Sequence, residues 1–411
     1  MIDDQRFSAR AGAAGGFFLA LAPLGAAGAL GLAAAAAVAG LAAARSRLVR
    51  GLAVDLQRTG PAGLFAALFL GWAGASLAWS PEAAWQTGLK LVVLWPLFAF
   101  AAWGAASPRD ADRALMRRAI VAGVLGLLAL LGVEALFQAS LMHAANPGAA
   151  DAGPLLRNLG RGAAVLVILA APACVCLWRL GAPVWALGAV ALTTLGVSAG
   201  FGLDANALAA TLALAAALLA LRAPALAAGG TLALFAIALL AAPLIAHGID
   251  VAGEGLSLPP SWAIRTDMWS FATDRIAERP WFGWGLDAAR AFDAPVERLE
   301  GVQTTTLQIH PHSAPLQIWM ETGAVGATLA ASALLGLAAA AARALKTDRP
   351  AAAACAGATA AFATLAGVSY GAWQDWLWAT AAAAVAAVAV ARRSRLEAEA
   401  DRKLAADMEA L

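Results

Sequence analysis

Long apolar runs separated by short polar connections make up most of the chain. Each run approaches the length needed to cross a hydrocarbon layer of about 30 Å as a helix of about 20 residues. Backbone N–H and C=O groups in lipid must be paired within the segment, so these runs are expected to be helices. The pattern predicts twelve spans, at residues 14–28, 29–44, 61–79, 85–106, 117–137, 160–178, 183–200, 203–222, 228–247, 316–342, 351–369 and 374–391.

The first apolar stretch, residues 15–44, carries no charge and has two interpretations. It is either one long tilted helix or a tight hairpin that turns near residues 23–28. Arginines precede the stretch at Arg6 and Arg10 and follow it from Arg45 onward. Positive flanks on one side of a membrane require an even number of crossings between them, so the charges favour the hairpin.

Composition agrees with this pattern, since 62% of the 411 residues are hydrophobic and only 13% are charged. The short polar connections leave no room for a separate soluble domain, so residues 1–411 are interpreted as a single all-α, polytopic membrane domain. The first apolar run lacks a cleavable signal pattern and is expected to be retained. Nothing in the composition indicates a nucleic acid partner, whereas contact with membrane lipids is expected.

Arginine and lysine cluster at alternate connections, which predicts an orientation. By the positive-inside rule, the connections near residues 109–118, 179, 222, 343–349 and 392–395 are cytoplasmic. The polar connections between them, notably 138–159 and 248–311, then face the other side. In a bacterial inner membrane that side is the periplasm.

The longest polar region, residues 248–315, lies between the ninth and tenth spans and contains an amphipathic helix at Trp262–Pro280. Its apolar face is expected to lie in the membrane interface. Arg265 on its polar face suits bidentate contact with phosphate oxygens. An equally simple interpretation is that Arg265 pairs with an acidic neighbour and only solubilises the loop.

Two of the four histidines, His310 and His312, stand where this loop re-enters the membrane. A neutral imidazole is a suitable general base, and the approach to these histidines is rich in arginine, which indicates an anionic substrate. The alternatives are that His312 only caps the next helix and that His310 is a solvated or supporting histidine. The approach holds Arg265, Arg275, Arg279 and Arg290.

Motifs around the loop follow a recognisable order. They are Trp79-Ser80-Pro81, then Arg265-x-x-x-Trp269, Glu278-Arg279-Pro280-x-x-Gly283-x-Gly285, His310-Pro311-His312-Ser313-x-x-Leu316-Gln317 and Glu321-x-Gly323. This order, together with a long loop between spans nine and ten of twelve, resembles the O-antigen ligase family of bacterial envelope enzymes and covers nearly the whole chain. Glu321 is interpreted either as structural or as a group that orients a residue of the site.

The resemblance implies a GT-C-like, metal-independent glycosyltransferase without a cofactor, which moves a glycan from undecaprenyl diphosphate to the lipid A core in the periplasm. It places the family's essential histidine at His312 and its loop arginine at Arg265. A second family arginine has no counterpart in residues 198–204, so Arg161 is the candidate, with Arg157 behind it. The remaining candidate substrate-binding residues are His310, Trp269, Ser313 and Asp204, of which Asp204 also suits a helix cap.

Two other functions remain open. A polymerase of the same superfamily, which extends the glycan on its lipid carrier, would use the same residues with a different acceptor. A transporter would show inverted repeats and polar residues at mid-membrane, whereas here the polar residues gather at one face. The three cysteines, Cys174, Cys176 and Cys355, lie in apolar spans and are interpreted as core residues without a metal.

Overall fold

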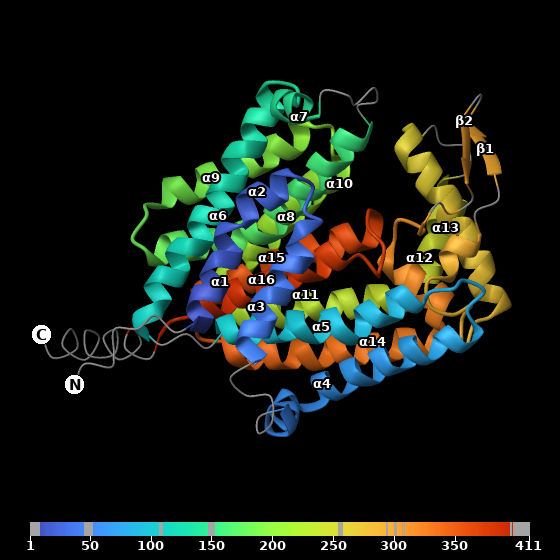
Figure 1. Ribbon diagram of the computed structural model, residues 1–411, viewed down its shortest axis with the longest axis horizontal. Coiled ribbons are helices and arrows are strands. Elements are labelled where there is room, and N and C mark those ends of the chain that lie inside the picture. The colour runs from blue at the N-terminus through green and yellow to red at the C-terminus, as the bar shows by residue number, and fades with distance from the viewer. Residues whose placement is uncertain are drawn as a thin grey trace, which may run out of the picture.

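The computed structural model describes residues 9–44, 52–106, 110–146, 153–253, 258–292, 295–299, 302–305, 307, 309–394 and 397. Over these residues the chain forms a bundle of helices (Figure 1), which confirms an all-α, polytopic membrane protein. One small antiparallel hairpin interrupts the long loop; it pairs β1 (Pro295–Leu299) with β2 (Val302–Thr305).

Each of the twelve predicted spans overlaps an apolar helix or a helix pair of the structure, but not all of these helices are long enough to cross a membrane. Seven helices are long and apolar enough to cross a membrane, and an eighth crossing is the pair α11 and α12 if that bent pair counts as one span. The seven lie in α4 (Leu52–Ala75) with η1 (Ser76–Trp79), α5 (Trp85–Ala106), α6 (Asp110–Leu136), α8 (Gly153–Arg179), α10 (Asp204–Arg222), α14 (Ala314–Leu345) and α15 (Arg349–Val368). The four shorter segments are α1 (Ala9–Leu19) with α2 (Leu21–Ala26), α3 (Gly31–Ala44), α9 (Val184–Gly200) and α16 (Asp375–Ala391).

The first apolar stretch is a hairpin, as its flanking charges favour. The chain turns back at residues 27–30, where Ala29 has a φ of +64°, and α1 packs against α3. The interpretation as one long tilted helix is therefore wrong.

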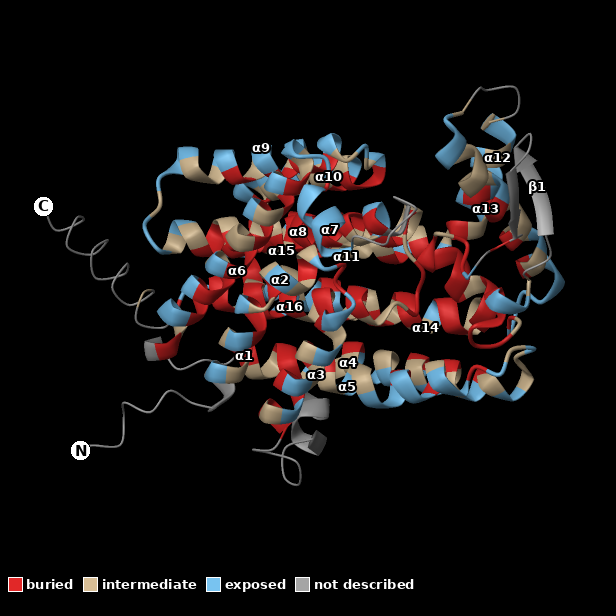
Figure 2. Cartoon of the chain, turned by 45° about the horizontal axis from the view of Figure 1, so that its top comes forward, coloured by how far each residue is buried: buried red, intermediate tan, exposed pale blue. Residues whose placement is uncertain are grey.

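Helix α8 lies at the centre of the bundle and packs against α6, α9, α10, α15 and α16. Buried residues concentrate in α8, α15 and α16, while the outer faces of α5 and α9 are exposed (Figure 2). Many buried positions of α15 and α16 are alanines, which let neighbouring helices approach closely in a membrane. The exposed large apolar side chains of α4, α5 and α9 suit contact with lipid tails.

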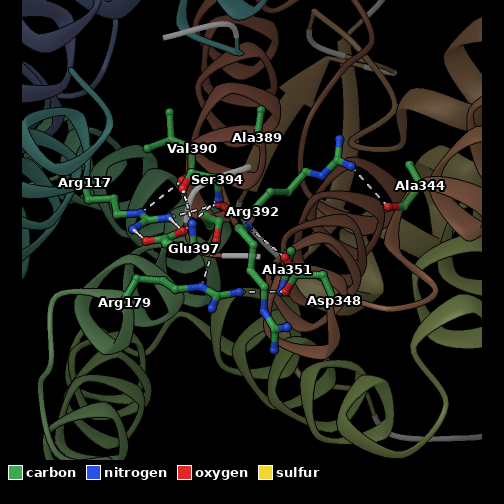
Figure 3. A network of polar contacts seen from close by, with 12 residues as sticks. Arg117, Arg179, Ala344, Asp348, Ala351, Ala389, Val390, Arg392, Ser394 and Glu397 are labelled. Carbon is green, nitrogen blue, oxygen red and sulfur yellow. Dashed lines mark hydrogen bonds and ion pairs between the residues drawn. The ribbon is translucent and has the colours of Figure 1, made fainter. Parts of the chain in front are cut away.

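The arginines of α6 and α8 meet the ends of α15 and α16 at one end of the bundle (Figure 3). Arg117 donates to Glu397 at 2.6 Å, and Arg179 donates to Asp348 at 2.8 Å. Both arginine side chains are almost fully buried; the first contact ties the C-terminal segment to α6, and the second ties α8 to the start of α15. Arg117 and Arg179, which the positive-inside rule predicted on the same side of the membrane, therefore lie at the same end of the bundle.

The ninth span ends earlier than the apolar pattern predicted. Helix α11 (Pro224–Leu240) stops before Ala241, and α12 (Ala242–Gly253) leaves it at an angle of 71°. The loop helix α13 (Pro260–Glu278) forms where expected, but its apolar residues Met268, Trp269 and Ile276 are buried against α12 and α14. Protein rather than lipid covers this face, so the expected place of the apolar face in the membrane interface is wrong.

Helix α14 is broken at Gly323, whose φ of +64° is one that side chains disfavour. The segment Pro280–Gly285 runs beside the break and replaces the lost helical hydrogen bonds. Its N–H groups at Trp284 and Gly285 donate to the carbonyls of Met320 and Glu321, at 2.9 and 2.8 Å. Its carbonyls at Pro280 and Trp281 accept from Ala324 and Val325, at 2.8 and 3.3 Å. The tryptophan- and glycine-rich segment therefore has a structural role.

Candidate functional site

The turn at residues 310–313 leads directly into α14, which begins at Ala314, two residues before the predicted start of the tenth span. Ser313 is 4% exposed, and its Oγ accepts a hydrogen bond from the Leu316 N–H at 3.5 Å. Ser313 is thus the N-cap of α14, and this cap fixes where the turn meets the helix. A direct contact between Ser313 and substrate stays a prediction.

His312 takes a left-handed backbone conformation with a φ of +53°. Its Nδ1 lies 2.9 Å from the carbonyl oxygen of Ser369 in the turn between α15 and α16. A carbonyl can only accept, so Nδ1 carries the proton and Nε2 of the neutral ring keeps a free lone pair. This is the tautomer a general base requires if its Nε2 faces the substrate.

The surroundings keep the His312 imidazole neutral. Burial lowers the pKa of His312 below its usual 6.5, the hydrogen bond to Ser369 raises it, and the charge of Arg265 lowers it. The net shift is downward, so the ring is uncharged at neutral pH. The N-terminus of α14, which begins two residues later, acts in the same direction.

His310 supports His312 from inside the turn. It is 6% exposed, its Nδ1 accepts from the His312 backbone N–H at 3.0 Å, and its Nε2 lies 2.9 Å from the side-chain amide of Gln374. Burial, His312, Arg290 and Arg161 together lower the pKa of His310 to about 3. Because Nδ1 accepts, the proton lies on Nε2, and Gln374 Oε1, buried without a partner, accepts it once the amide is turned. Both ring nitrogens are thereby occupied, and the predicted contact of His310 with substrate stays untested.

Arg265, on the second turn of α13, carries an available positive charge. Its Nη1 donates to the Ser261 carbonyl at 3.2 Å, its guanidinium lies 5.3 Å from the Trp262 ring centre, and its Nε is buried without a partner. Burial lowers the pKa of Arg265, while Tyr370 and Asp204 raise it, and the group stays charged because its ordinary pKa is far above 7. Among the described residues no carboxylate forms an ion pair with Arg265, so pairing with an acidic neighbour is not what the loop shows.

Arg161 faces the same region from α8. Its Nη1 donates to the Asn158 side chain at 3.1 Å, and its charge lowers the pKa of both His310 and Tyr370. Helix α8 begins at Gly153, seven residues before the predicted start of the sixth span at residue 160, so both Arg157 and Arg161 lie within the helix. Arg157, one turn earlier, is exposed, and no described contact links it to the histidines.

Tyr370, the single tyrosine of the chain, belongs to this group, and the sequence reasoning missed it. Its hydroxyl donates to the Gly160 carbonyl at 3.2 Å. Burial raises the pKa of the Tyr370 hydroxyl, and Arg161 and Arg265 lower it. The phenol stays protonated and can donate. A lone tyrosine between the last two spans was the available signal.

Two further predicted residues lie beside the group. Asp204 opens α10, is exposed and forms no cap hydrogen bond, while its charge acts on Arg265. Trp269 is 5% exposed, and its Nε1 donates to the Pro311 carbonyl at 2.9 Å, which ties the histidine turn to α13. Contact of either side chain with substrate stays a prediction.

Helices α8 and α13 and two turns therefore bring together two cations, a neutral imidazole and a phenol, and α10 adds the Asp204 carboxylate near Arg265. Such a set can bind an anionic group and remove a proton from a hydroxyl. Among the described residues, no group of three or more His, Cys, Asp or Glu side chains could hold a metal ion.

The fold and this group define a polytopic membrane protein with a site suited to an anionic substrate. Residues 152–331 match the family model described as O-antigen ligase. This region runs from the start of α8 into α14 and holds Arg161, Arg265, His310 and His312. The resemblance drawn from the motifs is thereby confirmed over these residues.

A stretch of 93 residues is 34% identical to a protein from Rickettsia conorii that has been named as a polysaccharide ligase from inference. That match covers 21% of this chain and 23% of that protein, so the chain matches less than a quarter of its relative's length. No solved structure matches the chain. Both matches support a ligase-type function for a membrane protein.

Proposed function

We propose that the protein is a glycosyltransferase that moves an O-antigen glycan from undecaprenyl diphosphate to the lipid A core. The reaction would take place at the periplasmic face of a bacterial inner membrane, without a metal ion or cofactor. The observation that carries the proposal is the His312 tautomer: Nδ1 is held by Ser369, which leaves Nε2 as a base beside the charge of Arg265.

In this mechanism the donor arrives with its leaving group already in place. Arg265 and Arg161 bind the diphosphate, and His312 Nε2 accepts the proton of an acceptor hydroxyl. The hydroxyl oxygen forms a bond to the anomeric carbon as the bond from that carbon to the diphosphate oxygen breaks. The electron pair leaves with the lipid diphosphate, where fixed guanidinium charges stabilise it.

The proposal is tested with purified protein in detergent, an undecaprenyl-diphosphate-linked glycan and purified lipid A core. Transfer is expected to survive a chelator and to fall by about 10²-fold or more in His312→Ala, the scale of a lost general base. His143→Ala, an exposed histidine in the short helix α7 (Ser140–Ala145), is the matched control and should keep full activity. Full transfer by His312→Ala contradicts the mechanism, and glycan added only to lipid-linked glycan makes the protein a polymerase.

A further inference from the structure

We propose that Glu321 is a positioning residue that holds the histidine turn in place through a buried series of hydrogen bonds and one packing contact. The inference rests on the proposed function, because it concerns how His312 is kept in its working geometry. Glu321 lies in the first part of α14, just before the break at Gly323, and none of its surface is exposed.

The Glu321 carboxylate joins three segments that are distant in sequence. Its Oε2 accepts from the Asp287 N–H at 2.6 Å and from the Trp373 indole N–H at 2.5 Å. Its Oε1 accepts from the Gln317 side-chain amide at 2.9 Å and from the Ala289 N–H at 3.4 Å. The loop after α13, the start of α14 and the turn before α16 therefore meet on one side chain.

In all four contacts Glu321 is the acceptor, and this requirement limits which residues can occupy position 321. An ionised carboxylate only accepts hydrogen bonds, and it offers about four positions for donors. None of the ion pairs formed by the described residues includes Glu321. A buried acid without a cation is costly, and apolar side chains of similar volume usually fill such space at a lower cost in stability. Packing alone does not account for Glu321.

A continuous path leads from Glu321 to His312. Gln317 donates to Glu321, and its Oε1 accepts from the Ala372 N–H at 2.8 Å, so its amide orientation is fixed at both ends. The neighbouring Gly371 packs so closely on the His310 ring that an added Cβ would lie 2.7 Å from His310 Cγ. His310, held by Gln374, accepts from the His312 N–H.

The same turn also carries Ser369, whose carbonyl fixes the His312 tautomer. Trp373, which donates a hydrogen bond to Glu321, lies four residues after Ser369 in this turn. Moving residues 369–374 would therefore disturb both partners of His312 together, its backbone through His310 and its ring through Ser369. The carboxylate thus controls the orientation of a base that it does not touch.

In the variant Glu321→Gln the new side chain has nearly the same shape as glutamate, but it interrupts the series of hydrogen bonds. If the new amide presents its oxygen to Asp287 and Trp373, its NH2 group faces the NH2 group of Gln317. Gln317 cannot turn to accept without directing its own NH2 group at the Ala372 N–H. The double variant Glu321→Gln/Gln317→Glu removes this conflict. The carboxylate then at position 317 would accept both from the new amide at position 321 and from the Ala372 N–H, and only the long Ala289 contact is lost.

We expect Glu321→Gln to lower kcat by about 10-fold or more while KM for the donor changes less than about 3-fold, since only the transition-state step needs an oriented base. The double variant should recover kcat. Glu134→Gln is the matched control, because Glu134 is 4% exposed on α6 and accepts from the Leu141 N–H at 3.2 Å, a bond that glutamine can keep. Unchanged kcat in Glu321→Gln, or a loss that the double variant leaves unrepaired, overturns the inference.

A second measurement separates this inference from the proposed function. With four histidines in the chain, 15N-imidazole NMR can assign His310 and His312 through their single replacements. Wild-type His312 should show the Nδ1–H tautomer, Glu321→Gln should change the signals of both rings, and the double variant should restore them. Wild-type protein without transferase activity would contradict the proposed function. Histidine signals that are the same in wild type and Glu321→Gln would contradict the positioning role.

Discussion

The backbone N–H of His312 donates to Nδ1 of His310 at 3.0 Å, so one histidine of the pair holds the backbone of the other. The bond spans two residues, as in a turn closed by an asparagine side chain. It also helps His312 keep a positive φ, which is uncommon for residues other than glycine.

This relationship predicts different outcomes at position 310. His310→Ala removes the acceptor and should lower kcat by about 10-fold, within the range that general-base orientation can supply. His310→Asn should recover part of that loss, because its side-chain oxygen can accept from the N–H two residues on. Steady-state kinetics of the two variants checks this, and equal activities would show that the bond has no role.

The pH dependence of the reaction should report His312. Its pKa lies below 6.5, so kcat/KM should stay flat at neutral pH and decline as the pH falls through that lowered value and the base becomes protonated. Arg265→Gln removes a charge that lowers this pKa and should therefore move the acid limb toward higher pH. Profiles of the wild type and Arg265→Gln measure the shift, and coincident acid limbs would contradict the assignment.

Arg265 should matter chiefly for donor binding. Arg265→Ala is expected to raise KM for the diphosphate donor about 10-fold or more, since charge-assisted hydrogen bonds contribute about 1.5–3 kcal/mol. Arg265→Lys should be weaker than wild type, because lysine keeps the charge but loses the planar fork. Arg222→Ala, at the far end of α10, serves as control and should leave donor binding unchanged.

The Tyr370 phenol, on which the charges of Arg161 and Arg265 act, gives a separate test. Tyr370→Phe removes the hydrogen bond to Gly160, at a cost of about 1 kcal/mol in the free energy of unfolding. If the hydroxyl turns from Gly160 to donate its single proton to the bound diphosphate, KM for the donor rises in this variant as well. Thermal unfolding and kinetics of the same variant separate the two effects, and a changed unfolding temperature with an unchanged KM would limit Tyr370 to structure.

The ion pair between Arg117 and Glu397 should make the stability of the fold depend on pH in the acid range. The hydrogen bond from Arg117 lowers the pKa of Glu397 from 4.5 to about 2. A lowered pKa stabilises the fold above pH 4.5, and this contribution disappears as the pH falls toward 2. Glu397 is partly exposed, so we expect no more than about 1 kcal/mol. The difference in unfolding temperature between wild type and Glu397→Gln should therefore shrink over that pH range.

The apolar runs predicted where the apolar helices lie, because membrane burial leaves a local pattern in the sequence, although among the described residues only seven helices, or eight with the bent pair, are long enough to cross a membrane. Helix α5 has the predicted bounds, and α14 begins within two residues of the predicted start of the tenth span. The bend after Leu240 and the break at Gly323 could not be predicted, because their hydrogen-bonding partners and packing come from distant segments. A window of hydropathy contains no information about such partners.

Members of the candidate site could be predicted from the sequence where the residue type itself indicates a chemical role. His312, Arg265 and Arg161 do fall into one electrostatic group. The supporting positions of His310 and Trp269 depend on single contacts, with Gln374 and Pro311, that only the folded chain creates. Tyr370 was missed because its neighbours, Arg161 and Arg265, are more than 100 residues away in sequence.

The hydrogen bonding of residues 280–285 to the broken helix α14 limits how segments can be exchanged between this protein and its relatives. A chimaera that exchanges only the loop would disturb four backbone hydrogen bonds, two donated by the loop to the helix and two donated by the helix to the loop. Grafted specificity should therefore survive only when the loop and the first half of α14 are transplanted as one piece.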